Sequence, residues 1–225
     1  MRILTLVGAR PNFVKVAPLL EEMSSHPEIE PVLVHTGQHY DPQMSRAFFE
    51  ELEIPEPHIN LEAGSGSAVR QVAEIMLRLE GVMEEVQPDV VVVVGDVNST
   101  LAGALTAAKM GRPIAHVEAG LRSFDRTMPE EINRVITDTI SDLLFVTEPS
   151  GVENLLREGQ PRERIFLVGN VMIDALRRFL PRARCCAFPK ELYAWGRYET
   201  GLARSYAQQD DTAKARTAYQ DCFAL

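Results

Sequence analysis

Short apolar runs alternate with longer amphipathic segments through the first 180 residues of the chain. This alternation predicts repeated strand–helix units around a parallel sheet. The uninterrupted valine run at 90–94 predicts a central strand buried on both faces, because a half-exposed strand would alternate apolar and polar residues. We therefore expect an α/β fold with a Rossmann-like parallel sheet and helices on both faces.

The same pattern places the individual elements. Strands are expected at residues 2–7, 31–36, 89–95, 113–117, 143–146 and 164–168, with a weaker one at 58–61. Helices are expected at residues 12–25, 42–52, 69–86, 100–110, 129–141, 150–158 and 172–179. The segment 62–67 is rich in Gly and Ser and predicts a loop.

A change in composition predicts a boundary near Leu180. Residues 181–225 hold all three cysteines, the single Trp195, four of the five tyrosines and no histidine. We expect an α/β domain at 1–180 and a helical tail at 181–225. The spacing of apolar residues in the tail resembles one tetratricopeptide-type helical hairpin, and a fortuitous amphipathic helix pair is the alternative. Such a hairpin cannot bury its own face, so it would pack on the domain, pair with another copy in a homodimer, or bind a protein partner.

Composition narrows the classes of function. The chain has 225 residues and a formal charge of −9, which argues against general binding to nucleic acid or to anionic membranes. The longest aliphatic run, Val90 to Val94, is far shorter than the roughly 20 residues of a membrane-spanning helix. No secretory signal is recognisable, so we expect a cytoplasmic location. An odd number of cysteines, two of them adjacent, fits neither a disulfide framework nor a zinc site.

The residues that follow the strands are the candidates for chemistry, since parallel sheets bind ligands beyond the carboxyl ends of their strands. Asp96 and Glu118 end neighbouring strands, and Glu130 opens the helix after the Glu118 loop. Three carboxylates at one edge could share general acid and base roles. For Glu130 a structural alternative is a capping box with Thr127, or an ion pair with Arg134.

Cationic and neutral ligand contacts are expected at the same edge. Arg10 and Lys15 flank a helix start, which favours anions, although each could also be a solvated surface charge. His39 lies in the loop after a strand and is a candidate ligand contact, whereas His116 lies within a strand and is expected to be a hydrogen-bonded core residue. The histidines show no metal-binding spacing, and neither G-x-G-x-x-G nor a P-loop motif occurs.

Six blocks in order resemble the bacterial non-hydrolysing UDP-N-acetylglucosamine 2-epimerases. They are Gly8-Ala-Arg-Pro11 with Lys15, Gly37-Gln-His39, Pro88-Asp89 through Gly95-Asp96, His116-Val-Glu-Ala-Gly-Leu-Arg122, Pro129-Glu-Glu-Ile-Asn-Arg134, and Gly169-Asn-Val-Met-Ile-Asp-Ala175. The match covers residues 1 to about 178. The resemblance implies the first half of a two-domain GT-B-type fold.

The resemblance also implies an activity. Such enzymes interconvert UDP-N-acetylglucosamine and UDP-N-acetylmannosamine by eliminating UDP, forming a 2-acetamidoglucal and adding UDP back. Carried over by motif, Asp96, Glu118 and Glu130 are the catalytic acids, and Arg10, Lys15 and Arg134 contact the substrate. No metal or redox cofactor is implied.

The family pattern continues beyond the matched blocks. Its second domain carries the main uridine diphosphate site and a catalytic histidine, so we expect little epimerase turnover from residues 1–225 alone. Two other functions stay open: a non-catalytic half that binds the nucleotide sugar weakly or acts as an interaction module, and a GT-B-like nucleotide-sugar transferase.

Overall fold

The computed structural model describes residues 1–37 and 53–183, without the side chains of Arg10 and residues 178–183. The chain divides into two compact units, Met1–Leu176 and Arg177–Leu225. The first unit contains the sheet and all expected site residues. The helix expected at 42–52 and the helical hairpin expected in the tail lie outside the described residues.

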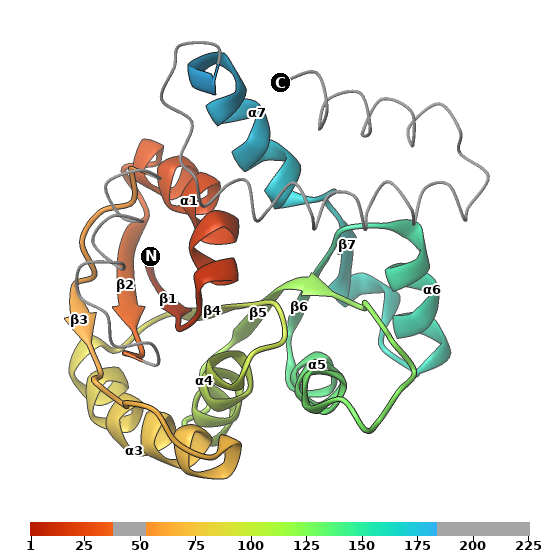
Figure 1. Ribbon diagram of the computed structural model, residues 1–225, viewed down its shortest axis with the longest axis horizontal. Coiled ribbons are helices and arrows are strands. Elements are labelled where there is room, and N and C mark those ends of the chain that lie inside the picture. The colour runs from red at the N-terminus through yellow and green to blue at the C-terminus, as the bar shows by residue number, and fades with distance from the viewer. Residues whose placement is uncertain (38–52, 184–225) are drawn as a thin grey trace. The chain divides into compact units, whose positions relative to one another are not determined.

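The sheet of the first unit is parallel throughout and has the order β3-β2-β1-β4-β5-β6-β7 (Figure 1). Its strands are β1 (Arg2–Val7), β2 (Glu30–His35), β3 (Ile59–Asn60), β4 (Val90–Val94), β5 (Ile114–Ala119), β6 (Leu143–Val146) and β7 (Ile165–Leu167). The expected parallel α/β sheet is confirmed. Strand ends differ from the expected ones by about two residues at most, within the usual variation of assigned boundaries.

The helices agree with the pattern almost as closely. They are α1 (Arg10–Ser25), α3 (Ala68–Val86), α4 (Asn98–Lys109), α5 (Pro129–Ile140), α6 (Pro149–Arg157) and α7 (Val171–Ala183), with a short 3-10 turn at Arg162–Arg164. Helices α3, α4 and α5 lie on one face of the sheet and α1 on the other (Figure 1). The sequence pattern predicted that the last helix ends at residue 179, but α7 continues to Ala183.

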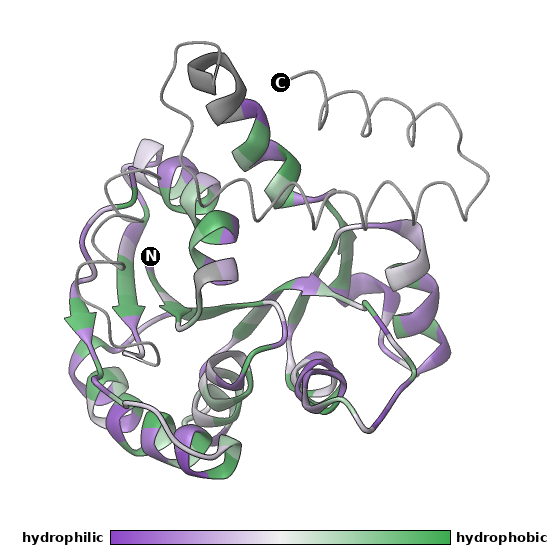
Figure 2. Cartoon of the chain, in the orientation of Figure 1, coloured by the Kyte–Doolittle hydropathy of each residue, from purple (hydrophilic) through white to green (hydrophobic). Residues whose placement is uncertain are grey.

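The core forms where the apolar stripes of the helices meet the central strands. In β4 the four residues Val91–Val94 are buried, as expected for a central strand. On α3, Ile75, Leu79 and Met83 recur every four residues and are fully buried. Figure 2 shows this apolar stripe beside the polar outer face of α3.

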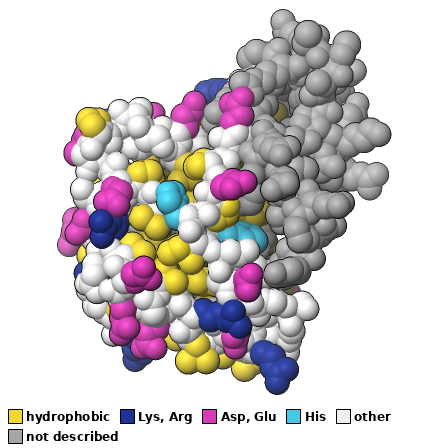
Figure 3. All heavy atoms as spheres, turned by 90° about the vertical axis from the view of Figure 1, so that its left-hand side faces the viewer, with side chains coloured by type: hydrophobic (Ala, Val, Ile, Leu, Met, Phe, Trp, Pro, Cys, Tyr) yellow, Lys and Arg dark blue, Asp and Glu magenta, His cyan; other side chains and the backbone are white. Residues whose placement is uncertain are grey.

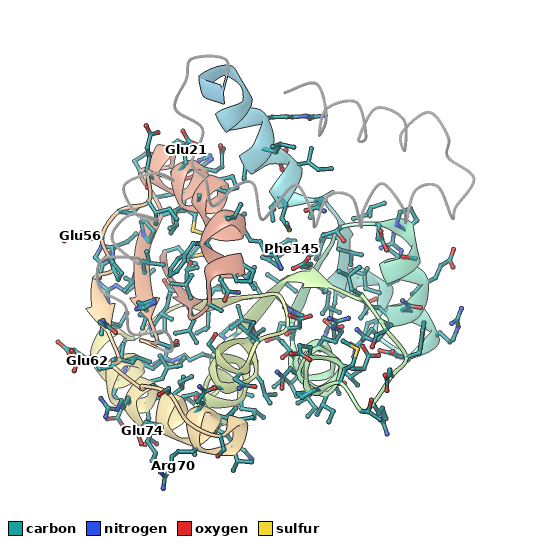
Figure 4. All side chains as sticks on the ribbon, viewed as in Figure 1. Glu21, Glu56, Glu62, Arg70, Glu74 and Phe145 are labelled. Atoms are coloured by element: carbon teal, nitrogen blue, oxygen red, sulfur yellow. The ribbon has the colours of Figure 1, made fainter. Side chains whose placement is uncertain are left out.

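The outer surface of this region is charged. Figure 4 shows Glu62, Arg70 and Glu74 pointing away from the sheet. On the face seen in Figure 3, acidic and basic side chains lie interspersed around a central apolar area. Among the described residues of that face, neither sign of charge forms a continuous patch.

The strand order brings one crevice to the centre of the sheet. The chain runs outward from β1 to β2 and β3 and then returns to place β4 on the other side of β1. This reversal is a topological switch point, where doubly wound sheets bind their ligands. The carboxyl ends of β1 and β4 therefore frame the centre of the candidate site.

A β-bulge distorts the end of β5. The register between β5 and β6 shifts between Val117 and Ala119, so Glu118 is the extra residue. Its φ of 74° is left-handed, a conformation that costs a non-glycine residue about 1–2 kcal/mol. Bulges of this kind re-aim a side chain, and such strain is concentrated at functional sites.

Gly120 follows this bulge and adopts a backbone conformation that favours glycine. Its φ is 82°, and a Cβ there would overlap the backbone of Gly151.

We predict that Gly120→Ala lowers the free energy of unfolding by about 3 kcal/mol, from left-handed strain plus overpacking. Gly111→Ala is the matched control, because Gly111 has a φ of 66° but open space around it, and it should cost only about 1–2 kcal/mol. Urea unfolding measures both, and equal losses would show that the Gly151 contact is relaxed easily.

Candidate active site

Lys15 and Glu118 meet at the switch point. The Lys15 ammonium on α1 forms an ion pair with the Glu118 carboxylate at the end of β5. The side chains are only 9% and 11% exposed. A Cβ on Gly95, just after β4, would lie 3.2 Å from Lys15 Nζ and 3.4 Å from Glu118 Oε2. The backbone of Gly95 therefore lies directly against the ion pair.

Asn12 fixes the start of α1 to β4. Its buried amide donates from Nδ2 to the Val94 carbonyl at 2.8 Å, and its Oδ1 accepts a hydrogen bond from the Ala9 amide at 3.1 Å. The second bond satisfies one of the free N–H groups near the helix start. Sequence reasoning placed Asn12 at the start of the helix but gave it no role at the site.

Helix α5 holds Asp96 in two ways. The Arg134 guanidinium forms an ion pair with the Asp96 carboxylate, and Asn133 Nδ2 donates to the Asp96 carbonyl at 2.8 Å. The Asp96 side chain is 31% exposed, which leaves it accessible to a ligand. Because β4 and β5 are adjacent, Asp96 and Glu118 lie at the same edge of the sheet, as expected from the sequence.

Glu130 is not brought to this edge by any described contact. Glu130 is exposed in the first turn of α5, and within residues 1–37 and 53–183 no hydrogen bond or ion pair involves its side chain. The alternative capping box with Thr127 is wrong, because Thr127 Oγ1 donates to Asp125 and the helix begins after Met128. The alternative ion pair with Arg134 is also wrong. The catalytic role of Glu130 stays a prediction.

The neighbouring Glu131 is the buried acid of α5. Its carboxylate accepts hydrogen bonds from the amide and hydroxyl of Ser123 at 2.9 Å and from the Phe124 amide at 3.0 Å. Burial opposes ionisation, but the bonds from Ser123 and Phe124 and the nearby Arg134 hold the pKa of Glu131 below its ordinary value. Glu131 thereby anchors the loop between β5 and α5. Helical periodicity could have identified it, since Glu131 and the buried Asp138 are seven residues apart on one face.

His116 is a core residue, as expected. It is fully buried, and its ring nitrogens lie 2.6 Å from Asp138 Oδ1 and 2.8 Å from the Gly95 carbonyl oxygen. Two expected ligand contacts cannot be placed: the Arg10 side chain and His39 lie outside the described residues, although the backbone of Arg10 begins α1.

Within the described part of the chain, no group of three or more His, Cys, Asp or Glu side chains could hold a metal ion. In the same residues, no helix is long and apolar enough to cross a bilayer.

The Lys15–Glu118 pair should matter for stability. Lys15→Met leaves a buried carboxylate without its partner and is expected to cost about 3 kcal/mol. Adding Glu118→Gln removes the unpaired charge and should restore most of that loss. Lys109→Met, at the exposed end of α4, should change stability by less than about 0.5 kcal/mol. Urea unfolding of the four proteins tests this, and a double variant as unstable as Lys15→Met would contradict a charge-based loss.

Glu131 should contribute to the acid sensitivity of the fold. A lowered pKa in the folded protein adds stability above the unfolded pKa of about 4.3, and this stability is lost as pH falls through the folded pKa. Glu131→Gln should therefore flatten the decline of stability below about pH 4.5. Unfolding measured from pH 7 to pH 3 provides the comparison, and parallel pH curves for the variant and the parent would disprove it.

Known proteins resemble this chain in sequence over most of its length. The profile of the family described as UDP-N-acetylglucosamine 2-epimerase matches residues 21–196. A UDP-N-acetylglucosamine 2-epimerase homolog from Methanococcus maripaludis is 53% identical over 176 residues, covering 78% of this chain and 48% of the relative. The Methanocaldococcus jannaschii UDP-N-acetylglucosamine 2-epimerase is 47% identical over 175 residues, covering 78% of this chain and 48% of that protein.

Solved structures give the same assignment. The crystal structure of Methanocaldococcus jannaschii UDP-GlcNAc 2-epimerase in complex with UDP-GlcNAc and UDP superposes with a TM-score of 0.80 at 43% identity, covering 88% of this chain and 54% of that one. A lipopolysaccharide galactosyltransferase at 16% identity and a TM-score of 0.54 shares the fold alone. The chain spans about half the length of the curated relatives it matches. On this agreement of sequence and structure, the chain belongs to the UDP-N-acetylglucosamine 2-epimerase family.

Proposed function

We propose that this chain supplies the proton-transfer edge of a UDP-N-acetylglucosamine 2-epimerase. The observation that carries the proposal is the placement of Asp96 and Glu118 at the ends of adjacent strands. Each carboxylate forms an ion pair with a cationic side chain, Arg134 or Lys15 respectively. In the reaction that the family resemblance implies, the C2 proton leaves, its electron pair forms the C1–C2 double bond, and the C1–O bond to UDP breaks. A proton then returns to the opposite face of C2, and UDP adds back to C1.

Each residue has a role in this proposal. Asp96 and Glu118 exchange the C2 proton, with Glu130 as the third acid. Lys15, Arg134 and Arg10 stabilise the negative charge that develops on the departing diphosphate, and His39 contacts the substrate. The start of α1 adds its N–H groups and dipole to the same edge.

The two ion pairs orient the cations of this edge so that they can stabilise negative charge that develops during the reaction. Lys15 and Arg134 are each held by an acid of the site, so the cations are oriented before a ligand arrives. Donors fixed in advance stabilise developing charge without reorganisation, which is the main electrostatic contribution to catalysis. A diphosphate near both cations would also loosen their hold on the carboxylates and leave Asp96 and Glu118 available as bases.

A second candidate substrate comes from another relative of the chain. The Pseudomonas aeruginosa UDP-2,3-diacetamido-2,3-dideoxy-D-glucuronate 2-epimerase is 45% identical over 185 residues. Its named substrate also carries an acetamido group on C2 of a UDP sugar, so the same proton exchange applies. A nucleotide-sugar ligand is common to both possibilities. The cytoplasmic location, the homodimer and the protein partner expected for the tail stay predictions.

Deuterium incorporation tests the proposed reaction. Residues 1–225 at high concentration are incubated in D2O with UDP-N-acetylglucosamine, UDP-N-acetylmannosamine or the diacetamido sugar nucleotide. We expect slow incorporation at C2 with inversion, and Asp96→Asn should reduce it by about 100-fold or more. Asp89→Asn is the matched control, because Asp89 accepts from the Arg2 amide at the opposite end of β4.

The outcomes separate the alternatives. Absence of deuterium at C2 from every sugar nucleotide, in a protein that binds UDP, would favour a non-catalytic binding half. Transfer of the sugar to an acceptor without exchange at C2 would favour a transferase.

A further inference from the structure

A buried charged cluster connects the two strands that carry the proposed acids. His116 is fully buried on β5, and its Nε2 donates to the Gly95 carbonyl at 2.8 Å. Gly95 directly precedes Asp96. The other ring nitrogen, Nδ1, lies 2.6 Å from Asp138 Oδ1 on α5. The ring therefore links the carboxyl end of β4 to a carboxylate behind β5.

The second carboxylate oxygen of Asp138 binds the chain just after β5, the strand that carries Glu118. Asp138 Oδ2 accepts from the Gly120 amide at 3.0 Å, two residues after Glu118. The Gly120 carbonyl in turn accepts from Asn154 Nδ2 at 3.0 Å, so both backbone groups of this residue are held. These bonds fix the chain just after the bulge that turns Glu118 toward Lys15.

Arg122 completes the charge balance of the cluster. Arg122 Nη2 lies 2.7 Å from Asp138 Oδ2, and the guanidinium also binds Glu158 through two bonds of 2.8 and 2.6 Å. Burial opposes ionisation of Asp138, but His116 and Arg122 hold the pKa of Asp138 below its ordinary value. An ionised carboxylate can accept from donors on both sides, whereas an amide has only one oxygen.

We infer that Asp138 is a positioning residue, whose single buried carboxylate sets the separation of Asp96 and Glu118 by holding the ends of β4 and β5 together. The described contacts of Asp138 reach His116, Gly120 and Arg122 and not the carboxylates of the proposed acids, so it acts through the backbone. The catalytic consequence rests on the proposed function, while the structural consequence does not.

Asp138→Asn tests the inference, with Asp142→Asn as its matched control. Asp142 Oδ2 accepts from the Ile114 amide, so it holds the opposite end of the same strand. In Asp138→Asn we expect the backbone amide signals of Asp96 and Glu118 to move in a ¹H–¹⁵N NMR spectrum. In Asp142→Asn both signals should stay in place.

A kinetic measurement accompanies the spectra. Asp138→Asn should slow C2 deuterium exchange at saturating substrate by about 100-fold, as expected for misplaced reacting groups, with KM changed by less than about twofold. Asp142→Asn should retain the parental rate. If the parent exchanges no deuterium, the proposed function fails, and the NMR comparison still decides the positioning role.

His116→Asn covers the possibility that Asp138→Asn does not fold. An asparagine amide can occupy the position of Nδ1 and donate to Asp138, but it is too short to reach the Gly95 carbonyl. We expect the Asp96 signal to move while the signals of Glu118 and Gly120 stay. A folded variant at either position with an unmoved Asp96 signal would overturn the inference.

Discussion

The ion pair between Lys15 and Glu118 is the interaction on which the proposed site depends. It joins α1 to β5 across the backbone of Gly95, so three elements meet at one pair of charges. Removing water from both charges is costly and is offset only by their mutual attraction and well-placed hydrogen bonds. The glycine after β4, the bulge in β5 and the anchoring of α1 by Asn12 are the local features that bring the two groups together.

Two cations of the site, Lys15 and Arg134, are already paired with its acids. The family resemblance assigns the cationic side chains of Lys15 and Arg134 to substrate binding. Both are ion-pair partners of the acids that it assigns to proton transfer. A diphosphate approaching this edge therefore meets oriented cations that already have partners. In the proposed reaction, substrate binding would exchange one ionic partner of Lys15 and Arg134 for another, and this exchange would free the Asp96 and Glu118 carboxylates when the leaving group is in place.

The strands and their ends could be predicted because two local signals coincide in this sequence. Most of the short apolar runs are followed by glycine and polar residues, and a parallel sheet gathers these ends at one edge. Asp96 and Glu118 could therefore be predicted to lie at the same edge from the strand pattern alone. The buried role of His116 followed similarly from its position inside a strand.

Contacts between distant elements could not be predicted in the same way. Thr127 and Glu130 have the spacing of a capping box, but Asp125 binds Thr127, and the buried acid that holds the loop is Glu131. The left-handed conformation of Glu118 depends on the register between β5 and β6, which no local pattern encodes. Asp138 resembles any polar helical residue until the strand ends on which it acts are known.

The central claim is that Asp96 and Glu118 form one site at the ends of β4 and β5. Carboxyl ¹³C NMR of the labelled chain during a UDP titration tests this claim most directly, because it observes both acids while their cationic partners meet a diphosphate. We expect the carboxyl signals of Asp96 and Glu118 to shift together along one binding curve, while that of Asp89 at the far end of β4 stays in place. Binding of UDP that leaves both signals unmoved, or moves them with unrelated affinities, would contradict it.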